Sequence, residues 1–77
     1  MSIIIKLNEI EVLKQFVRDI RSLDCDVDVV RGKYVVDAKS ILGLLSLSLS
    51  EPVTARINTD DEELIKQFEE ICTKYCA

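Results

Sequence analysis

Two hydrophobic periods alternate along this chain, and their order limits the folds that it can adopt. Residues 25–31 and 53–58 alternate apolar and polar side chains, a period of two that predicts half-buried strands. The apolar members of these two stretches are Cys25, Val27, Val29, Val53, Ala55 and Ile57. Asp26, Asp28 and Val30 point the other way. Each strand is therefore expected to turn one apolar face towards a core.

Two longer stretches have the period of an amphipathic helix. The first covers about residues 9–22, with Asn8 as its expected N-cap, and its apolar positions are Ile10, Leu13, Phe16, Val17 and Ile20. The second follows the expected cap residues Thr59 and Asp60, and its apolar stripe is Leu64, Ile65, Phe68, Ile71, Cys72 and Tyr75. Both helices are expected to cover one face of a sheet.

The remaining segments complete the order of elements. Residues 2–7 are rich in β-branched side chains and predict a strand, whose consecutive isoleucines indicate burial on both faces or at least a strong strand propensity. A tight turn at Arg31-Gly32 leads into a returning strand over residues 33–37. Residues 40–45 predict a short helix, and residues 46–50 predict a loop whose leucines fold under. The expected fold is α+β, in the order β-α-β-β-α-β-α. It forms a single domain over residues 1–77, with a four-stranded antiparallel sheet and helices on one face.

Charge and hydropathy exclude several classes of function. The net charge is −4, whereas nucleic-acid binding and polybasic membrane anchoring both need clustered Lys and Arg. No stretch approaches the roughly 18 apolar residues of a membrane span. Residues 1–7 are too short for the apolar part of a signal peptide. We therefore expect a cytoplasmic protein that neither binds nucleic acid nor inserts into membranes.

The chain contains no histidine, which removes Ser-His and Cys-His catalysis. Its three cysteines cannot form a closed set of disulfides. Cys72 and Cys76 lie four residues apart on one helix face, but Cys25 is distant and no fourth metal ligand is evident. We expect small buried hydrophobic thiols and a frayed terminus, with no metal or cofactor.

One acidic stretch resembles the start of a calcium-binding loop. It begins at Asp24, but Val29 stands where such a loop needs glycine and Val35 where it needs glutamate. Alternating carboxylates on an exposed strand face are the better interpretation. Since no glycine-rich phosphate loop is present either, nothing in the sequence supports an enzyme.

Ser40 has a specific argument of its own. As the expected N-cap of the short helix, its hydroxyl lies beside free backbone N–H groups that would also accept a phosphate. An ordinary capping role is the alternative. The helix carries Ile41, Leu42, Leu44 and Leu45, which cannot all face inward. We therefore expect an apolar docking patch beside the serine, with an ordinary core-covering helix as the rival interpretation.

The segment Gly32-Lys33, followed by residues 37–47 with the sequence Asp-Ala-Lys-Ser-Ile-Leu-Gly-Leu-Leu-Ser-Leu, resembles the HPr proteins. These are the histidine-containing phosphocarriers of the bacterial sugar phosphotransferase system. Gln15-Phe16-Val17 also resembles the first helix of that family. The resemblance implies an open-faced β-sandwich in which Ser40 is a regulatory phosphorylation site.

The same resemblance exposes a departure from the family. HPr proteins carry a Gly-Leu-His-x-Arg-Pro-like stretch at the start of the first helix, whereas residues 7–12 here read Leu-Asn-Glu-Ile-Glu-Val. The histidine position falls near Asn8 or Glu9. The resemblance therefore implies a member that has lost phosphocarrier chemistry.

The leading hypothesis is a noncatalytic HPr-like regulatory or adaptor protein, connected with the phosphotransferase system and carbon catabolite repression. Its expected partners are an HPr kinase-like enzyme and regulatory or transport proteins. Its expected partner-binding residues around Ser40 are Lys39, Ile41, Leu44, Leu45 and Leu47. Two alternatives stay open, namely an accessory or vestigial module with the same fold and an unrelated small ligand-binding domain. The oligomeric state does not follow from the sequence.

Overall fold

The computed structural model describes residues 1–47 and 49–76. The elements are β1 (Ser2–Ile5), α1 (Ile10–Ile20), β2 (Asp26–Arg31), β3 (Tyr34–Asp37), α2 (Ile41–Leu45), β4 (Val53–Asn58) and α3 (Glu62–Thr73). The predicted order β-α-β-β-α-β-α is confirmed. No helix within the described ranges is long and apolar enough to cross a bilayer.

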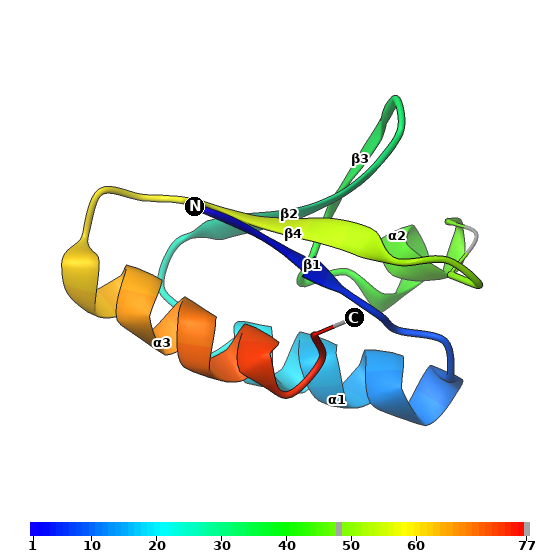
Figure 1. Cartoon of the computed structure of the whole chain (residues 1–77), viewed down its shortest axis with the longest axis horizontal. Coiled ribbons are helices and arrows are strands. Elements are labelled where there is room, and N and C mark those ends of the chain that lie inside the picture. Colours follow the sequence, from blue (N-terminus) through cyan, green and yellow to red (C-terminus); the bar gives the residue numbers. More distant parts are fainter. Residues whose placement is uncertain (48, 77) are drawn as a thin grey trace.

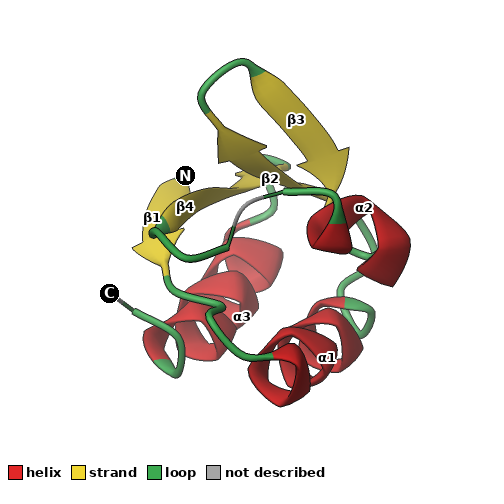
Figure 2. Ribbon diagram, turned by 90° about the vertical axis from the view of Figure 1, so that its right-hand side faces the viewer, coloured by secondary structure: helices red, strands yellow, loops and turns green. Residues whose placement is uncertain are grey.

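The four strands form one antiparallel sheet in the order β1-β4-β2-β3. The long helices α1 and α3 lie beside each other against one face of this sheet, and the opposite face stays open (Figures 1 and 2). The short helix α2 lies beyond the end of β3 and contacts both β3 and α1. The predicted arrangement of helices on one face is therefore correct.

The core lies between the sheet and the two long helices, because alternate strand residues point into that layer. Val29 pairs with Ala55, and Ala55 pairs with Ile3, so these side chains share the helix-facing side. Phe16 from α1 and Phe68 from α3 are fully buried against this side. Asp28 lies on the open face, where it accepts hydrogen bonds from Arg56 and Asn58.

The segment after α3 ties the last helix to the first helix and to β1. The ring of Tyr75 packs edge-on against Phe16, with centroids 5.3 Å apart. The Tyr75 hydroxyl donates to Asp19 on α1 over 2.7 Å. Along the outer margin of β1, the Lys6 N–H donates to the Tyr75 carbonyl over 2.8 Å, and Ile5 bridges to Cys76. The two helices and the strand margin are thus held by one short segment.

The hairpin between β2 and β3 turns one residue later than predicted. Its two central residues are Gly32 and Lys33, and Gly32 has a φ of +60°. A positive φ at the first central position is typical of a type II′ turn, which glycine adopts without steric cost. The prediction of a glycine in the turn is correct, but Gly32 is the first central residue of the turn and not the second.

The N-caps of both long helices lie later in the chain than predicted. Glu9, and not Asn8, is the N-cap of α1, and its side chain makes no capping hydrogen bond. Asp61, and not Thr59 or Asp60, caps α3 by accepting hydrogen bonds from the N–H groups of Glu63 and Leu64. Several adjacent residues can each cap a helix, so local sequence left the register open.

The first strand ends at Ile5, before its predicted end at Leu7. Its isoleucines are not buried on both faces. Ile5 is fully buried, whereas Ile4 points to the open side of the sheet and is 59% exposed. Only one side of the sheet is covered by helices, so a run of three isoleucines must leave the middle one uncovered.

The loop over residues 46–50 agrees with its prediction where the structure describes it. Leu47 is buried and Leu49 packs partly against the core, so these leucines fold under. Ser48 lies outside the described residues. The fourth strand then begins after Pro52 with the predicted alternation, because Val53, Ala55 and Ile57 are all buried.

Candidate functional site

Ser40 caps α2 as predicted. Its Oγ accepts a hydrogen bond from the Gly43 N–H over 3.1 Å, while its own N–H donates to the Asp37 carbonyl over 3.0 Å. A Cβ placed on Gly43 would stand only 3.3 Å from the Ser40 Oγ. The absence of a side chain at Gly43 therefore leaves room for the hydroxyl. Ser40 is half-buried, with its hydroxyl beside the first N–H groups of the helix.

Lys39, a predicted partner-binding residue, is engaged with its own chain. Its ammonium donates to the Leu23 carbonyl over 2.7 Å, and its N–H donates to the Asp37 carboxylate over 2.8 Å. The Arg21 guanidinium donates twice to the Lys39 carbonyl, over 3.1 and 3.2 Å. These contacts fasten the residue before Ser40 to the end of α1 and fix the serine in place.

The apolar residues of α2 divide between two sides. Leu44, a predicted partner-binding residue, is fully buried and is not part of the exposed apolar surface. Ile41 is half-buried. Leu42 and Leu45 are 81% and 47% exposed. Residues three apart share a helix face, so Ile41 and Leu44 take the inner side while Leu42 and Leu45 take the outer side.

Two further residues change the predicted patch. Leu47 is buried and joins the core, so it is not an exposed docking residue either. Leu42 was not among the predicted partner-binding residues, although it is the most exposed large apolar side chain of α2. Its three-residue spacing from Leu45 was a signal that would have found it.

A row of basic side chains on α1 borders the short helix. Lys14, Arg18 and Arg21 lie at helical spacing, and together with Val17 and Ile41 they line a hollow of about 290 Å³. The helical pattern of residues 9–22 does not connect these three cations with Ser40. The contact between α1 and α2 brings them together.

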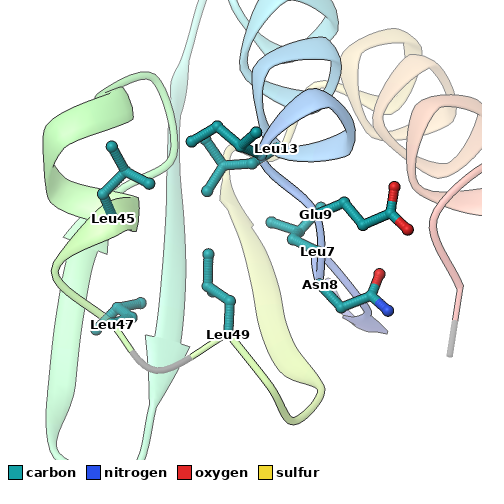
Figure 3. A pocket seen from close by; sticks show the side chains of 8 residues that line it. Leu7, Asn8, Glu9, Leu13, Leu45, Leu47 and Leu49 are labelled. Carbon is teal, nitrogen blue, oxygen red and sulfur yellow. The ribbon is translucent and has the colours of Figure 1, made fainter.

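The place of the missing histidine lies on a second hollow, of about 240 Å³ (Figure 3). Its lining residues are Leu7, Asn8, Glu9, Ile10, Leu13, Leu45, Leu47 and Leu49. Figure 3 shows Leu45, Leu47 and Leu49 on one side, with the Glu9 carboxylate and the Asn8 amide directed away from them. The structure thus brings the start of α1 and the end of α2 around one leucine-lined hollow.

The cysteines give this surface no reactive group. Burial, with a smaller contribution from the nearby Cys76, raises the pKa of the Cys72 thiol to about 12. Burial also raises the pKa of Cys25, partly offset by Lys39. Both thiols therefore stay protonated near neutral pH. No cluster of metal-ligating side chains occurs among the residues that the structure describes.

These features define a class, a small open-faced α+β sandwich with a capped serine beside an apolar and basic surface. The chain belongs to the HPr family, because the family model described as the PTS HPr component phosphorylation site matches residues 12–74. The matched segment contains Ser40 and begins just after Asn8 and Glu9. Members of this family are phosphocarriers that interact with other proteins of the phosphotransferase system.

Solved structures of HPr proteins share the fold. HPr-C-His from Thermoanaerobacter tengcongensis is 23% identical with a TM-score of 0.75, and the match covers 96% of this chain and 92% of that one. HPr from Bacillus anthracis is 20% identical with a TM-score of 0.76, covering 97% and 93%.

A third similar structure is Crh, a catabolite repression protein of Bacillus subtilis described as a swapped, intertwined dimer. It is 25% identical with a TM-score of 0.68, and the match covers 95% of this chain and 87% of that one. No curated protein matches the chain closely enough to count as a relative.

Proposed function

We propose that this protein is a noncatalytic regulatory or adaptor member of the HPr family, and that Ser40 is its phosphorylation site. The observation that carries the proposal is the position of Ser40. Its hydroxyl caps a helix whose next turn exposes Leu42 and Leu45 to solvent. A serine in this position couples a modifiable oxygen to a surface that a protein partner can cover. The likeness to Crh, a catabolite repression protein, supports a regulatory role.

The surface also favours a particular partner chemistry. Lys14, Arg18 and Arg21 form a basic border beside Ile41, although the whole chain carries a net charge of −4. An acidic border on the partner would speed its association by electrostatic steering, while apolar contacts with Leu42 and Leu45 would hold it. We therefore propose a protein partner with apolar residues ringed by Asp or Glu.

Phosphorylation would change this surface in a defined way. Transfer of the terminal phosphoryl group of ATP to the Ser40 Oγ releases ADP and the hydroxyl proton, and adds about −1.5 to −2 charges at pH 7. The free N–H groups at the start of α2 favour an anion there. The new charge stands between the basic row and the apolar outer side of α2, so it would alter which partners bind.

The start of α1 supports the noncatalytic part of the proposal. Asn8 and Glu9 occupy the place of the family's histidine, and the chain has no histidine elsewhere. Their side chains are directed away from the leucines of the hollow (Figure 3). Such a protein would work in the cytoplasm, where the resembled family works, through its partners and not through phosphate transfer.

Incubation with an HPr kinase and ATP, followed by mass spectrometry of peptides, tests the phosphorylation. We expect one phosphate on Ser40 in the native protein and none in Ser40→Ala. Ser46→Ala is the matched control, since Ser46 is the C-cap at the opposite end of the same helix and its loss should leave the labelling unchanged. An unlabelled Ser40 under conditions that label an authentic HPr would refute the regulatory switch.

Partner binding is tested separately with Leu42→Asp. This substitution adds charge to the outer side of α2 without touching the core, so circular dichroism should stay unchanged while capture of regulatory or transport proteins falls at least tenfold. Leu45→Asp should act in the same direction. Capture that is unaffected by both variants would favour the accessory-module alternative.

A further inference from the structure

In the part of the chain that the structure describes, one margin of the sheet has no strand or terminal segment paired along it. β1 forms the margin whose end the residues after α3 cover, through the Lys6–Tyr75 hydrogen bond and the Ile5–Cys76 bridge. β3 forms the opposite margin (Figure 2). Among the described residues, no hydrogen bond from outside the sheet reaches the backbone of Val35. β3 is therefore the margin that is open to another strand.

The hydrogen-bond phase of the β2–β3 hairpin shows which backbone groups face outward. The Ala38 N–H donates to the Val27 carbonyl over 2.9 Å, so that pair is hydrogen-bonded. In an antiparallel ladder, hydrogen-bonded and non-hydrogen-bonded pairs alternate. The Val30–Val35 pair lies three positions from the Val27–Ala38 pair, so it is a non-hydrogen-bonded pair. Val35 therefore points its N–H and carbonyl groups away from β2, towards the free margin.

The side chains along this margin are unusual for an exposed edge. Tyr34 and Val35 are 70% and 54% exposed. Natural proteins usually protect such edges with charges directed at an incoming strand, with proline or with a bulge. Here Lys33 and Asp37 stand two residues before and after Val35, so one end of the edge is positive and the other is negative.

We propose that β3 pairs with β3 of a second copy of this chain, antiparallel and with Val35 on the two-fold axis. Val35 directs its N–H and carbonyl outward, and a pairing centred on Val35 sets them against the same two groups of the second copy. In that register Lys33 of each copy stands opposite Asp37 of the other. Opposite charges across strands stabilise a pair, and a two-fold interface repeats the contact. This charge match selects a second copy as the occupant.

The same register gives Tyr34 a site. Tyr34 stands opposite Val36 of the second copy. Both side chains lie on the helix-facing side of the sheet, because Val36 pairs with the buried Val29. A hollow of about 380 Å³ lies there, and its lining residues are Arg31, Tyr34, Val35, Val36, Ser46 and Leu47. A tyrosine suits such a site because its ring is apolar and its hydroxyl can stay hydrated.

Sedimentation velocity over a wide concentration range tests the pairing. β3 has four residues, so the interface is short, and we expect a dimer whose fraction rises with concentration. Val35→Lys should shift the native protein's dimer to monomer at every concentration, because two like charges meet on the axis. Ile4→Lys is the matched control: Ile4 is equally exposed on the opposite edge strand, and the variant should associate like the native protein.

Site-specific crosslinking supplies a second readout in a Cys76→Ser background. Facing residues of a bonded antiparallel pair have Cα atoms about 5.5 Å apart, so Val35→Cys should give crosslinked dimers with a short bismaleimide, whereas Ile4→Cys should not. A native protein that stays monomeric at all concentrations would overturn the proposal. So would a dimer that survives Val35→Lys, as one made by exchanging another strand would do, or equal crosslinking of both cysteine variants.

Discussion

The residues around Ser40 show which features of a site can be predicted from the local sequence. A serine before a short apolar run predicted a cap, and the cap is present because it needs only the N–H three residues later. The division of α2 was harder to predict, since burial of Leu44 depends on packing against β3 and α1. A five-residue helix is too short for its pattern to show which side meets the core.

At this scale Ser40→Ala should lower the free energy of unfolding by about 1 kcal/mol, because the Gly43 N–H loses its acceptor. Ser40→Thr keeps a capping oxygen and should lose less. Urea denaturation followed by circular dichroism measures both. Equal losses in the two variants would mean that the hydroxyl makes no capping contribution.

Cys72 predicts a dependence of stability on alkaline pH. Its thiol pKa is 9.0 in an unfolded chain and about 12 in the fold, because burial disfavours the thiolate. The unfolded state therefore binds fewer protons in that window, so stability is complete below about pH 9 and falls as the pH rises towards 12. Burial and the hydrogen bond to Asp19 raise the pKa of Tyr75 in the same direction.

Urea denaturation at pH 8 and pH 10.5 measures this effect. The native protein should lose stability between the two values, and Cys72→Ala should lose less. The variant starts from a lower stability because it removes a buried atom, so only the difference between the two pH values is compared. An identical difference in both proteins would contradict the assignment to Cys72.

Among the elements, the long helices were the easiest to predict and their ends the hardest. The period of residues 10–20 identified most of the inner face of α1, since Leu13, Phe16 and Ile20 are buried, but Ile10 in the first turn is 47% exposed. The contact between α1 and the segment after α3 was not predictable. It depends on Tyr75 reaching Asp19, which lies 56 residues away along the chain, and no local pattern encodes that pairing.

Tyr75→Phe should therefore destabilise the fold by about 1.5 to 3 kcal/mol, the usual worth of a hydrogen bond to a charged group. Lys74→Ala is the control on the same carboxylate. The ammonium of Lys74 lies 3.3 Å from Asp19 but is exposed, and such pairs contribute only about 0 to 1 kcal/mol. Thermal unfolding should rank the native protein, Lys74→Ala and Tyr75→Phe in that order.

The whole molecule has one core and little reserve of stability. The sheet and two helices of a 77-residue chain share the same buried side chains, so small domains of this size depend on each large one. The fold class was predictable because alternating and helical periods follow each other without interruption. The site was only half predictable, because the hollow at Asn8 and the basic row on α1 arise from elements meeting in space.

Phe68→Ala should cost about 3 to 5 kcal/mol through lost burial and a cavity. That loss is comparable with the whole stability of many small domains, so we expect a broad or absent thermal transition. Phe68→Leu keeps most of the volume and should retain a cooperative transition at lower temperature. If Phe68→Ala instead unfolds sharply near the midpoint temperature of the native protein, the fold depends less on this side chain than its burial indicates.

The residues that cover the end of the β1 margin affect how sheets of this protein can associate edge to edge. A sheet with two open margins can recruit neighbours without limit and lengthen into a fibre. In this sheet the backbone of Tyr75 and Cys76 occupies the end of the first margin, at Ile5 and Lys6, and so hinders strand addition there. Edge-to-edge assembly is therefore expected to end after a single partner, and truncation before Tyr75 would remove that hindrance.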